Sequence, residues 1–202
     1  MRANAVILEQ PERIVVAPLT LDAPGPDDVV VAVETSGVSA GTERLLWTGR
    51  MPNFPGMGYP LVPGYEAVGR VVEAGPSSGR RVGDRVFAPG ARCFGEVRGL
   101  FGAAADTIVL PGARTARLSD KFSDSAILLA LAATARHALA APDAHAPDLI
   151  IGHGAFGRLM ARIAVAQGAA PMVWERSAAR RHGADGYAVC DPDDDPRADY
   201  AS

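Results

Sequence analysis

The sequence predicts an α/β protein in which a β-rich N-terminal domain precedes part of a doubly wound parallel sheet. Residues 1–120 consist of short β-branched runs separated by Gly and Pro, a spacing typical of a compact β-barrel or sandwich. From residue 148 the pattern becomes strand, helix, strand, helix and strand, with a glycine-rich loop after the first strand. We therefore expect a β-rich domain over 1–120, a connecting helix and linker over 121–147, and strands one to three of a nucleotide-binding domain over 148–202.

The strands expected in the first domain lie in AVIL, DDVVVAVETSG, EAVGRVVEAG, GDRVFAPG and DTIVLPG. The period then changes over SDKFSDSAILLALAATARHALAA, where apolar residues recur at helical spacing and Ser123 can serve as the N-cap. The last part is expected to hold strands over 148–152, 171–175 and 186–190, a helix over about 156–168 and a short helix over 177–183. The acidic end, DPDDDPRADYAS, is expected to be a loop or a frayed terminus.

The composition is that of a globular protein, with 48% hydrophobic and 21% charged residues. No apolar run reaches the roughly 18 residues that a membrane span needs, and the N-terminus lacks the pattern of a signal peptide, so the cytoplasm is the predicted location. A net charge of −3 argues against a nucleic-acid partner. Cys93 and Cys190 lie far apart without metal-binding spacing and are expected to be reduced thiols.

A glycine pattern, G-x-G-x-x-G, stands between an apolar strand and an amphipathic helix. Its first glycine permits a tight turn, the second lets the backbone approach a pyrophosphate, and the third lets helix and strand pack closely. Amides at the start of the helix would face the phosphates, and His153 is expected to be a loop residue beside them. The residues expected to bind the cofactor here are Gly152, Gly154, Ala155, Phe156 and Gly157. A doubly wound fold without a nucleotide is the alternative.

Glu175 ends the second predicted strand, about 20 residues after the glycine loop, where an acid binds the ribose hydroxyls. A carboxylate at this point repels a 2′-phosphate, which favours NAD over NADP. Arg176, Arg180 and Arg181 lie nearby and weaken that preference. Glu175 and Arg176 are the expected cofactor contacts on this strand.

Several segments in this order resemble the medium-chain dehydrogenase/reductase superfamily. SGVSAGTERLLWTG (36–49) is similar to the segment of the first catalytic-zinc ligand, and PLVPGYEAVGRVVEAG (60–75) to the G-H-E segment. VGDRV (82–86), FGAAADTIVLP (101–111) and LLALAATARHAL (128–139) fill the next motif positions. The resemblance implies a GroES-like β-barrel catalytic domain followed by a Rossmann domain.

Three longer segments resemble the bacteriochlorophyllide a dehydrogenase family of bacterial photosynthesis: GVSAGTERLLWTGRMPNFPGMGYPLVPGYEAVG, CFGEVRGLFG and LALAATARHAL. Membership of this family implies NAD-dependent oxidation of a 1-hydroxyethyl side chain on a chlorin ring to acetyl, in bacteriochlorophyll biosynthesis. Two alternatives are a zinc-free NADPH-dependent quinone or enone reductase of the same superfamily, and a tetrapyrrole-binding module without catalysis.

The ligand positions of the zinc members carry other residues in this chain. Ser39 or Ala40 stands at the Cys position and Tyr65 at the His position, so that Glu66 is the one carboxylate left. Ser and Tyr are poor zinc ligands compared with thiolate and imidazole. We therefore expect no metal.

Oxidation of an alcohol without a metal needs a base or proton relay within about 3 Å of the hydroxyl. Tyr65 is the first choice, because it replaces a metal-ligand His. The resemblance also places a nicotinamide-orienting residue at Thr134. The other candidates for the proton acceptor are Ser39, Thr42, Glu43 and His137. For each of them a packing, capping or surface role is the alternative.

Apolar and aromatic side chains are interleaved with Gly and Pro in LLWTGRMPNFPGMGYP (45–60). Gly and Pro exclude a regular helix, so this segment is expected to be a loop, and its side chains suit a flat hydrophobic macrocycle. The residues expected to contact the substrate are Trp47, Met51, Phe54 and Tyr59, with Arg98 for a ring carboxylate. An ordinary loop that covers the core is the alternative.

A doubly wound nucleotide fold has six strands in the order 3-2-1-4-5-6, of which 148–202 supplies three. We expect this chain to be a truncated form of a protein of about 300 residues that cannot complete catalysis. The first strand would then be an edge strand. Association through that edge into a homodimer, or disorder beyond about Gly183, is expected.

Overall fold

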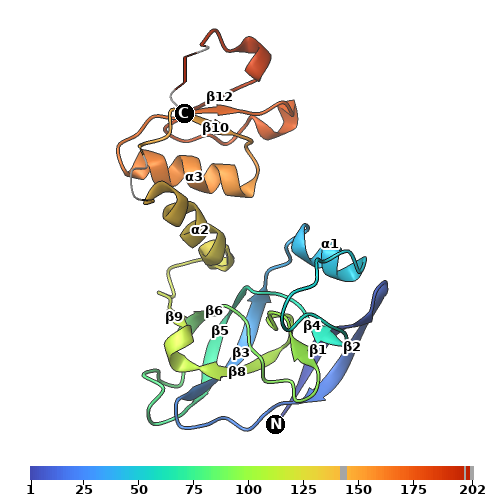
Figure 1. Ribbon diagram of the computed structural model, residues 1–202. Helices are drawn as coiled ribbons and strands as arrows, with labels where there is room; N and C mark the ends of the chain where they lie inside the picture. The colour runs from blue at the N-terminus through green and yellow to red at the C-terminus, as the bar shows by residue number, and fades with distance from the viewer. Residues whose placement is uncertain (142–144, 198, 201–202) are drawn as a thin grey trace. The chain divides into compact units, whose positions relative to one another are not determined.

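The structure is a computed structural model that describes residues 1–141, 145–197, 199 and 200. Its contacts divide the chain into two compact units, Met1–Leu128 and Leu129–Ser202 (Figure 1). Each unit is described by itself. The domain boundaries at 120 and 148 stay a prediction.

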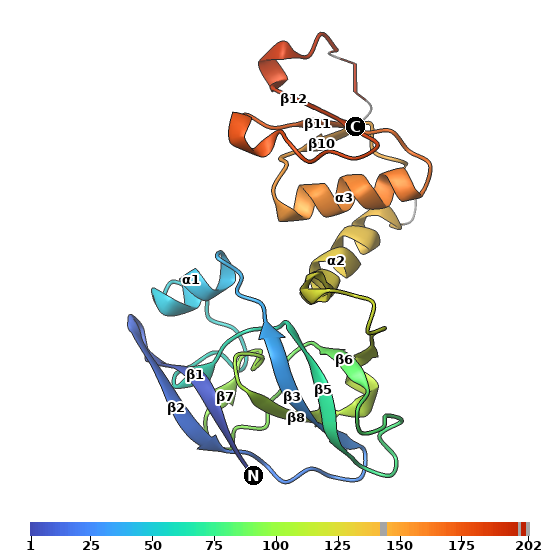
Figure 2. The ribbon, with the colours of Figure 1, turned by 180° about the vertical axis from the view of Figure 1, so that it is seen from behind.

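The first unit is built from two sheets (Figures 1 and 2). Its strands are β1 (Arg2–Gln10), β2 (Arg13–Thr20), β3 (Asp28–Ser36), β4 (Leu61–Val62), β5 (Ala67–Ala74), β6 (Arg85–Ala88), β7 (Arg98–Gly99), β8 (Thr107–Pro111) and β9 (Ala116–Arg117). One sheet has the order β2-β1-β4-β7 and the other the order β8-β3-β5-β6-β9. Pairing is antiparallel except between β4 and β7.

β3 contributes three consecutive residues to the core of the first unit, since Val29, Val30 and Val31 are all fully buried. Consecutive residues of a flat strand point to opposite faces, so three buried residues in a row are not expected from a regular strand. β3 is irregular at this point, because its register against β5 shifts between Val30 and Val31. An isolated bridge joins Ala5 of β1 to Ala105, in the segment before β8. The β-rich prediction for this part is confirmed.

A short helix, α1 (Thr42–Trp47), follows β3. The sequence predicted a loop over 45–60, and this is wrong for its first residues, because Gly49 is the first helix breaker after Thr42 and leaves room for a helical turn. Gly49 has a φ of +68° and ends the helix. A 3-10 turn, η1 (Gly112–Arg114), lies after β8.

The predicted helix from Ser123 begins as a 3-10 turn, η2 (Asp124–Leu128), and becomes α-helical only in α2 (Leu129–Leu139). The Ser123 hydroxyl accepts from the Ser125 amide at 3.3 Å, so it caps the 3-10 turn. The segment before it is tied to the first unit, since the buried Arg85 donates to the Phe122 carbonyl at 2.5 Å.

The second unit contains a three-stranded parallel sheet of order β10-β11-β12. Its elements are β10 (Leu149–Ile151), α3 (Ala155–Ala166), β11 (Met172–Trp174), η3 (Ala178–Arg180), β12 (Ala188–Cys190) and η4 (Pro192–Asp194). The core joins Ile150, Ala161 and Val173, and α2 packs on α3. This is the predicted order of strands three, two and one, with shorter strands.

Two predictions for the second unit are wrong. The helix over 177–183 is a single 3-10 turn, because the Arg180 carbonyl accepts from the His153 ring and from Arg158 instead of continuing a helix. The segment after Gly183 is ordered where it is described, since β12 pairs with β11. In the described residues, no helix is long and apolar enough to cross a membrane.

Candidate active site

The glycine loop leads from β10 into α3 through a turn that needs glycine. Gly152 has a φ of +98°, which residues with a side chain rarely adopt. Gly154 is the N-cap of α3, and the first helical bond runs from the Arg158 amide to its carbonyl at 3.0 Å. The amides of Ala155 and Phe156 have no acceptor among the described residues. Free amides at a helix start favour an anion such as a phosphate.

Gly157 allows the close approach of helix and strand that the glycine pattern predicts. A Cβ atom built there would lie 1.8 Å from the Gly152 carbonyl oxygen. A contact of that length is sterically excluded, so any other residue would push α3 away from β10.

Glu175 lies beside the glycine loop, directly after β11. Its Oε1 accepts from the Ser177 amide at 2.8 Å and its Oε2 from the His153 amide at 2.9 Å. These hydrogen bonds, first that of Ser177 and then that of His153, hold the pKa of the carboxyl below its usual value. The group is therefore a fixed anion, and each oxygen keeps a lone pair for a hydroxyl donor.

An open cleft of about 390 Å³ lies at this end of the sheet. Its lining residues come from the ends of two parallel strands and from the segment after β12. They are Ile151, Gly152, Trp174, Glu175, Arg176 and Pro192. Ligands of open α/β sheets bind outside the carboxyl ends of the strands, which is where this cleft is.

Two of the three arginines near Glu175 are paired with aspartates. Arg176 lies 3.5 Å from Asp193, and Arg181 lies 3.5 Å from Asp191 and 4.0 Å from Asp194. The aspartates offset the positive charge that a 2′-phosphate would need.

His153 is a correction to the sequence prediction. Its side chain is fully buried and does not lie in the loop beside a phosphate site. Ring Nδ1 is 2.6 Å from the Arg180 carbonyl and Nε2 is 2.8 Å from the Tyr187 hydroxyl. The imidazole therefore lies beneath the loop as part of the fold.

The first unit holds two carboxyl groups in apolar surroundings. Glu66 is 5% exposed, and its Oε2 has no hydrogen-bond partner among the described residues. Glu43 Oε2 accepts from the Ser39 amide at 2.9 Å, but its buried Oε1 also lacks a partner there. Burial raises the pKa of both groups, and the charge of Glu43 raises the pKa of Glu66 further. Glu43 and Glu66 together therefore favour a state in which one of the two carboxyl groups is protonated.

Glu43 also lines an apolar cavity of about 150 Å³. Trp47, at the end of α1, forms part of the same wall and is 43% exposed. The other lining residues are Val6, Leu8, Ile14, Gly37, Val38, Pro63, Gly64 and Ala104. Among the described residues that line this cavity, Glu43 is the one ionisable group, and burial raises the pKa of its carboxyl.

A larger cleft of about 530 Å³ lies on the same unit. Phe54 and Phe101 line it together with three exposed arginines, Arg92, Arg98 and Arg114. None of the three arginines has an acidic partner within 4 Å among the described residues. Arg98 Nη1 donates to the Tyr59 carbonyl at 3.4 Å, and Glu96 also lines the cleft, so three arginines face one carboxylate there. Apolar rings beside an excess of guanidinium groups suit a flat ligand that carries an anion.

Comparison with known proteins gives the family. Residues 25–120 match the alcohol dehydrogenase GroES-like domain. The chain is 54% identical over its whole length to the 2-desacetyl-2-hydroxyethyl bacteriochlorophyllide A dehydrogenase of Cereibacter sphaeroides, and 55% identical over 99% of its length to that of Rhodobacter capsulatus. It spans 65% and 64% of the length of these relatives.

Solved structures agree with this result. A zinc-binding dehydrogenase from Sinorhizobium meliloti 1021 bound to NADP is 26% identical, with a TM-score of 0.75 over 96% of this chain and 63% of its own. The 2R,3R-butanediol dehydrogenase of Bacillus subtilis, at 22% identity, shares the fold, with a TM-score of 0.78 over 98% of this chain and 65% of its own. The chain belongs to the medium-chain dehydrogenase/reductase superfamily.

At the positions of the zinc ligands in the zinc members of this superfamily, the chain carries Ser39 or Ala40 and Tyr65. In the described residues, no group of three or more His, Cys, Asp and Glu side chains could hold a metal. Tyr65 is half-buried and packs edge-on against Phe101, with ring centroids 5.5 Å apart. The residues at the zinc position therefore do not fit the ion.

The superfamily resemblance also placed Thr134 and His137 near a nicotinamide. Both lie exposed on α2 in the second unit, and the Thr134 hydroxyl donates to the Ala130 carbonyl at 3.0 Å. Ser39 and Thr42 lie at the start of α1, beside Glu43, and the Thr42 amide is 3.5 Å from the Ser39 hydroxyl. The first unit therefore brings Ser39, Thr42 and Glu43 together.

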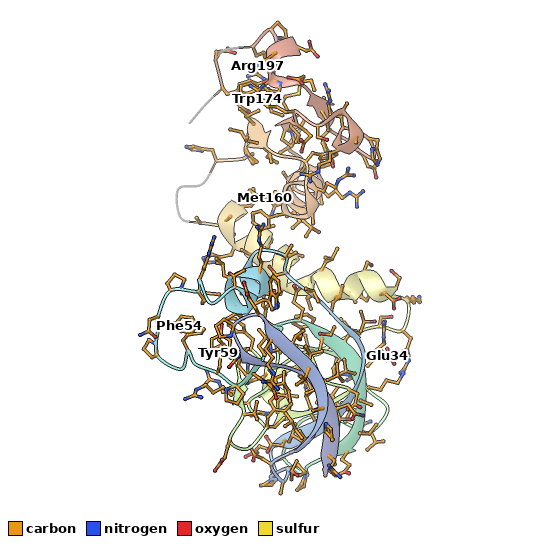
Figure 3. All side chains as sticks on the ribbon, turned by 90° about the vertical axis from the view of Figure 1, so that its right-hand side faces the viewer. Glu34, Phe54, Tyr59, Met160, Trp174 and Arg197 are labelled. Atoms are coloured by element: carbon orange, nitrogen blue, oxygen red, sulfur yellow. The ribbon has the colours of Figure 1, made fainter. Side chains whose placement is uncertain are left out.

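The predicted substrate residues lie in three places, and Trp47 is the one that lines the apolar cavity beside Glu43. Met51 and Tyr59 pack against a core cluster that includes Leu46, and the Tyr59 hydroxyl donates to the Leu46 carbonyl. Phe54 and Arg98 line the large cleft, and Figure 3 labels Phe54 on its loop. The packing of Met51 and Tyr59 corrects the expectation that the whole loop faces a ligand.

The sequence did not predict a role at the site for three residues that lie there in the structure. They are Glu66, His153 and Trp174. Glu66 was treated as a lone carboxylate, because nothing in the spacing shows that Glu43 approaches it. A polar residue inside an apolar strand context, as in VPGYEAVG, is a signal that could have marked it.

Proposed function

We propose that this protein is an NAD-dependent dehydrogenase that oxidises the 1-hydroxyethyl side chain of a bacteriochlorophyllide to acetyl. The observation that carries this proposal is the identity of 54–55% over essentially the whole chain with two relatives whose names state that substrate. Because the chain spans 65% and 64% of those relatives, the activity of the whole protein is the proposal.

The nucleotide would bind at the glycine loop. The free amides of Ala155 and Phe156 would receive the pyrophosphate, and Gly154 leaves open space above the helix start. The fixed carboxylate of Glu175 would accept from the ribose hydroxyls, with Trp174 and Pro192 along the same cleft. NAD, once bound, supplies the hydride acceptor for the oxidation.

The charges around Glu175 favour NAD over NADP. A 2′-phosphate would have to lie beside a carboxylate whose pKa is lowered, and so would meet a full negative charge. Two of the three arginines that could offset this charge, Arg176 and Arg181, have aspartate partners. Arg180 stays the one nearby arginine that could favour NADP.

The chlorin would be bound by the cleft of Phe54 and Phe101. Its ring suits the two aromatic side chains, and its carboxylate suits one of the three arginines, with Arg98 as first choice. A chlorin ligand would explain why aromatic rings and arginine side chains line the same cleft.

The hydroxyl proton needs an acceptor within hydrogen-bond reach. Glu43 borders the apolar cavity, and its charge raises the pKa of Glu66, so when one carboxyl of the pair is protonated and the other is ionised, the ionised carboxylate can accept the hydroxyl proton. Tyr65, Ser39, Thr42 and His137 stay candidates. No step is assigned to a metal, because the residues at the zinc position do not fit one.

The test is a turnover assay with the hydroxyethyl chlorin and either NAD or NADP. From a form as long as the relatives we expect acetyl product, seen as a red shift of the chlorin absorption, together with NADH. From the 202-residue chain, which supplies three of the six strands of the nucleotide fold, we expect no turnover. Reduction of a quinone with NADPH and no chlorin oxidation would favour the reductase alternative. Chlorin binding without hydride transfer would favour a binding module.

A second test addresses the predicted homodimer. β10 is the outer strand of the described sheet, and Ile151 at its end is 79% exposed. If copies associate through this edge, Ile151→Lys should shift the chain toward a monomer in size-exclusion chromatography, because charge on an edge strand opposes pairing. A monomer before and after substitution would contradict it.

A further inference from the structure

The ring of His153 has its tautomer set by its partners. The Arg180 carbonyl can only accept, so Nδ1, at 2.6 Å, must carry the proton. In the neutral ring Nε2 then accepts from the Tyr187 hydroxyl at 2.8 Å. With a fully buried ring and both nitrogens satisfied, this side chain has one orientation.

The backbone of His153 is also held on both sides. Its amide donates to Glu175 Oε2 at 2.9 Å, and its carbonyl accepts from Arg158 Nε at 3.1 Å. Arg158 also donates to the Arg180 carbonyl at 2.9 Å, the same oxygen that the ring contacts. One residue therefore connects the glycine loop, α3 and the segment after β11.

We propose that His153 is a positioning residue for the nucleotide: its buried ring fixes the amide that orients the Glu175 carboxylate, and so supports discrimination against a 2′-phosphate. This inference rests on the proposed function, since it names what sets the cofactor preference of that site. His153 touches neither the nucleotide nor the reacting atoms.

The geometry explains why a ring buried under the loop affects what the loop binds. Glu175 rejects a 2′-phosphate only if its charge stays directed at the ribose. Its Oε1 is held by Ser177, in the segment that ends at Arg180, and its Oε2 by His153. Both amides depend on the imidazole. The His153 amide belongs to the same residue as the ring, and the Ser177 amide lies in the segment that the ring holds through the Arg180 carbonyl.

The test uses the 202-residue chain with ADP-ribose and 2′-phospho-ADP-ribose, whose contacts fall on this half of the site. Binding is followed by the fluorescence of Trp174, which lines the cleft, in a Trp47→Phe background. The variants are His153→Phe and Tyr187→Phe. Ala164→Gly, a buried position near the other end of α3, is the control for lost stability alone.

For the parent chain we expect tighter binding of ADP-ribose than of its 2′-phosphate. In Tyr187→Phe and His153→Phe the ratio of the two dissociation constants should fall about tenfold, the equivalent of one hydrogen bond. In Ala164→Gly the ratio should stay unchanged although the midpoint of unfolding falls. Nitrogen NMR of the parent should show the Nδ1–H tautomer for His153.

The failures can be told apart. A parent chain that binds neither compound overturns the proposed nucleotide function and this inference with it. A parent that prefers ADP-ribose, with the same ratio in both variants, overturns the inference alone. The inference also fails if Ala164→Gly lowers the ratio as much as Tyr187→Phe, or if His153 shows the Nε2–H tautomer.

Discussion

Glu66 shows at the scale of one residue how burial and charge act together. Its carboxyl is almost fully buried, one oxygen has no partner among the described residues, and the charge of Glu43 adds to the cost of ionisation. Within the described part of the chain, no Arg, Lys or His lowers the pKa of either group. A folded-state pKa above the unfolded value means that the native state holds the proton more strongly than the unfolded state.

The sign of the pH dependence follows. The stability that this proton contributes is fully present below the unfolded pKa and is lost as the pH rises through the folded pKa. Glu66→Gln removes the ionisation and keeps the shape. We expect it to raise the free energy of unfolding by about 1 kcal/mol or more at about pH 8, and by less at about pH 4.

Thermal unfolding of Glu66→Gln and of the parent across this pH range measures the difference. Glu9→Gln, on the surface in an exposed pair with Arg13, is the matched control and should have a small effect on stability. An equal effect of Glu66→Gln at both pH values would show that the group titrates as if exposed.

At the scale of the element, two glycines between β10 and α3 have different roles, one in folding and one in binding. Gly157 is required by the packing of the helix, whereas Gly154 has an ordinary φ of −77° and open space around it. Glycine at Gly154 is therefore not explained by the fold and is explained by close approach of a phosphate.

Two alanine substitutions should separate these roles. Gly157→Ala should lower the free energy of unfolding by about 2 kcal/mol or more, because its Cβ would meet the Gly152 carbonyl at 1.8 Å. Gly154→Ala should change stability by no more than about 1 kcal/mol, because the loss of a favoured N-cap residue opposes the gain from a less flexible unfolded chain. It should weaken ADP-ribose binding about tenfold or more, as measured by calorimetry. Unaltered binding in a stable Gly154→Ala variant would contradict the assigned phosphate site.

The glycine loop, the order of the three parallel strands and the β-rich first unit could all be predicted, because each depends on local residue patterns. The approach of Glu43 to Glu66 could not, since it joins α1 to the segment before β5. The burial of His153 could not either, because it depends on Tyr187 and on Arg180, 34 and 27 residues away. The early start of α1 was missed because the glycines and prolines after it outweighed its own helical residues.

At the scale of the whole molecule, the two units have separate cores. The first has a large cluster that includes Val29, Val86 and Ile108, and the second a small one of Ile150, Ala161 and Val173. The chain has two tryptophans, and Trp47 belongs to the first unit and Trp174 to the second.

Single-tryptophan variants can therefore follow each unit. We expect the chain with Trp174 alone to show a lower urea midpoint than the chain with Trp47 alone, because the second core is smaller and its strands have three residues each. Added ADP-ribose should raise only the Trp174 midpoint. Coinciding midpoints that move together would show that the units unfold as one.

The indole of Trp174 donates to the Asp195 carboxylate at 2.6 Å, and the hydroxyl of Tyr200 donates to the same group. The hydrogen bond from Tyr200, and then that from Trp174, lower the pKa of Asp195. The carboxylate therefore stays ionised as the pH falls past its usual pKa, and the contact is lost only when stronger acid protonates the group. The fluorescence emission of Trp174 should therefore depend on the pH as well as on whether a ligand is bound in the cleft. Titrations near neutrality would report ligand alone, while strongly acidic samples would release the ring and imitate a binding signal.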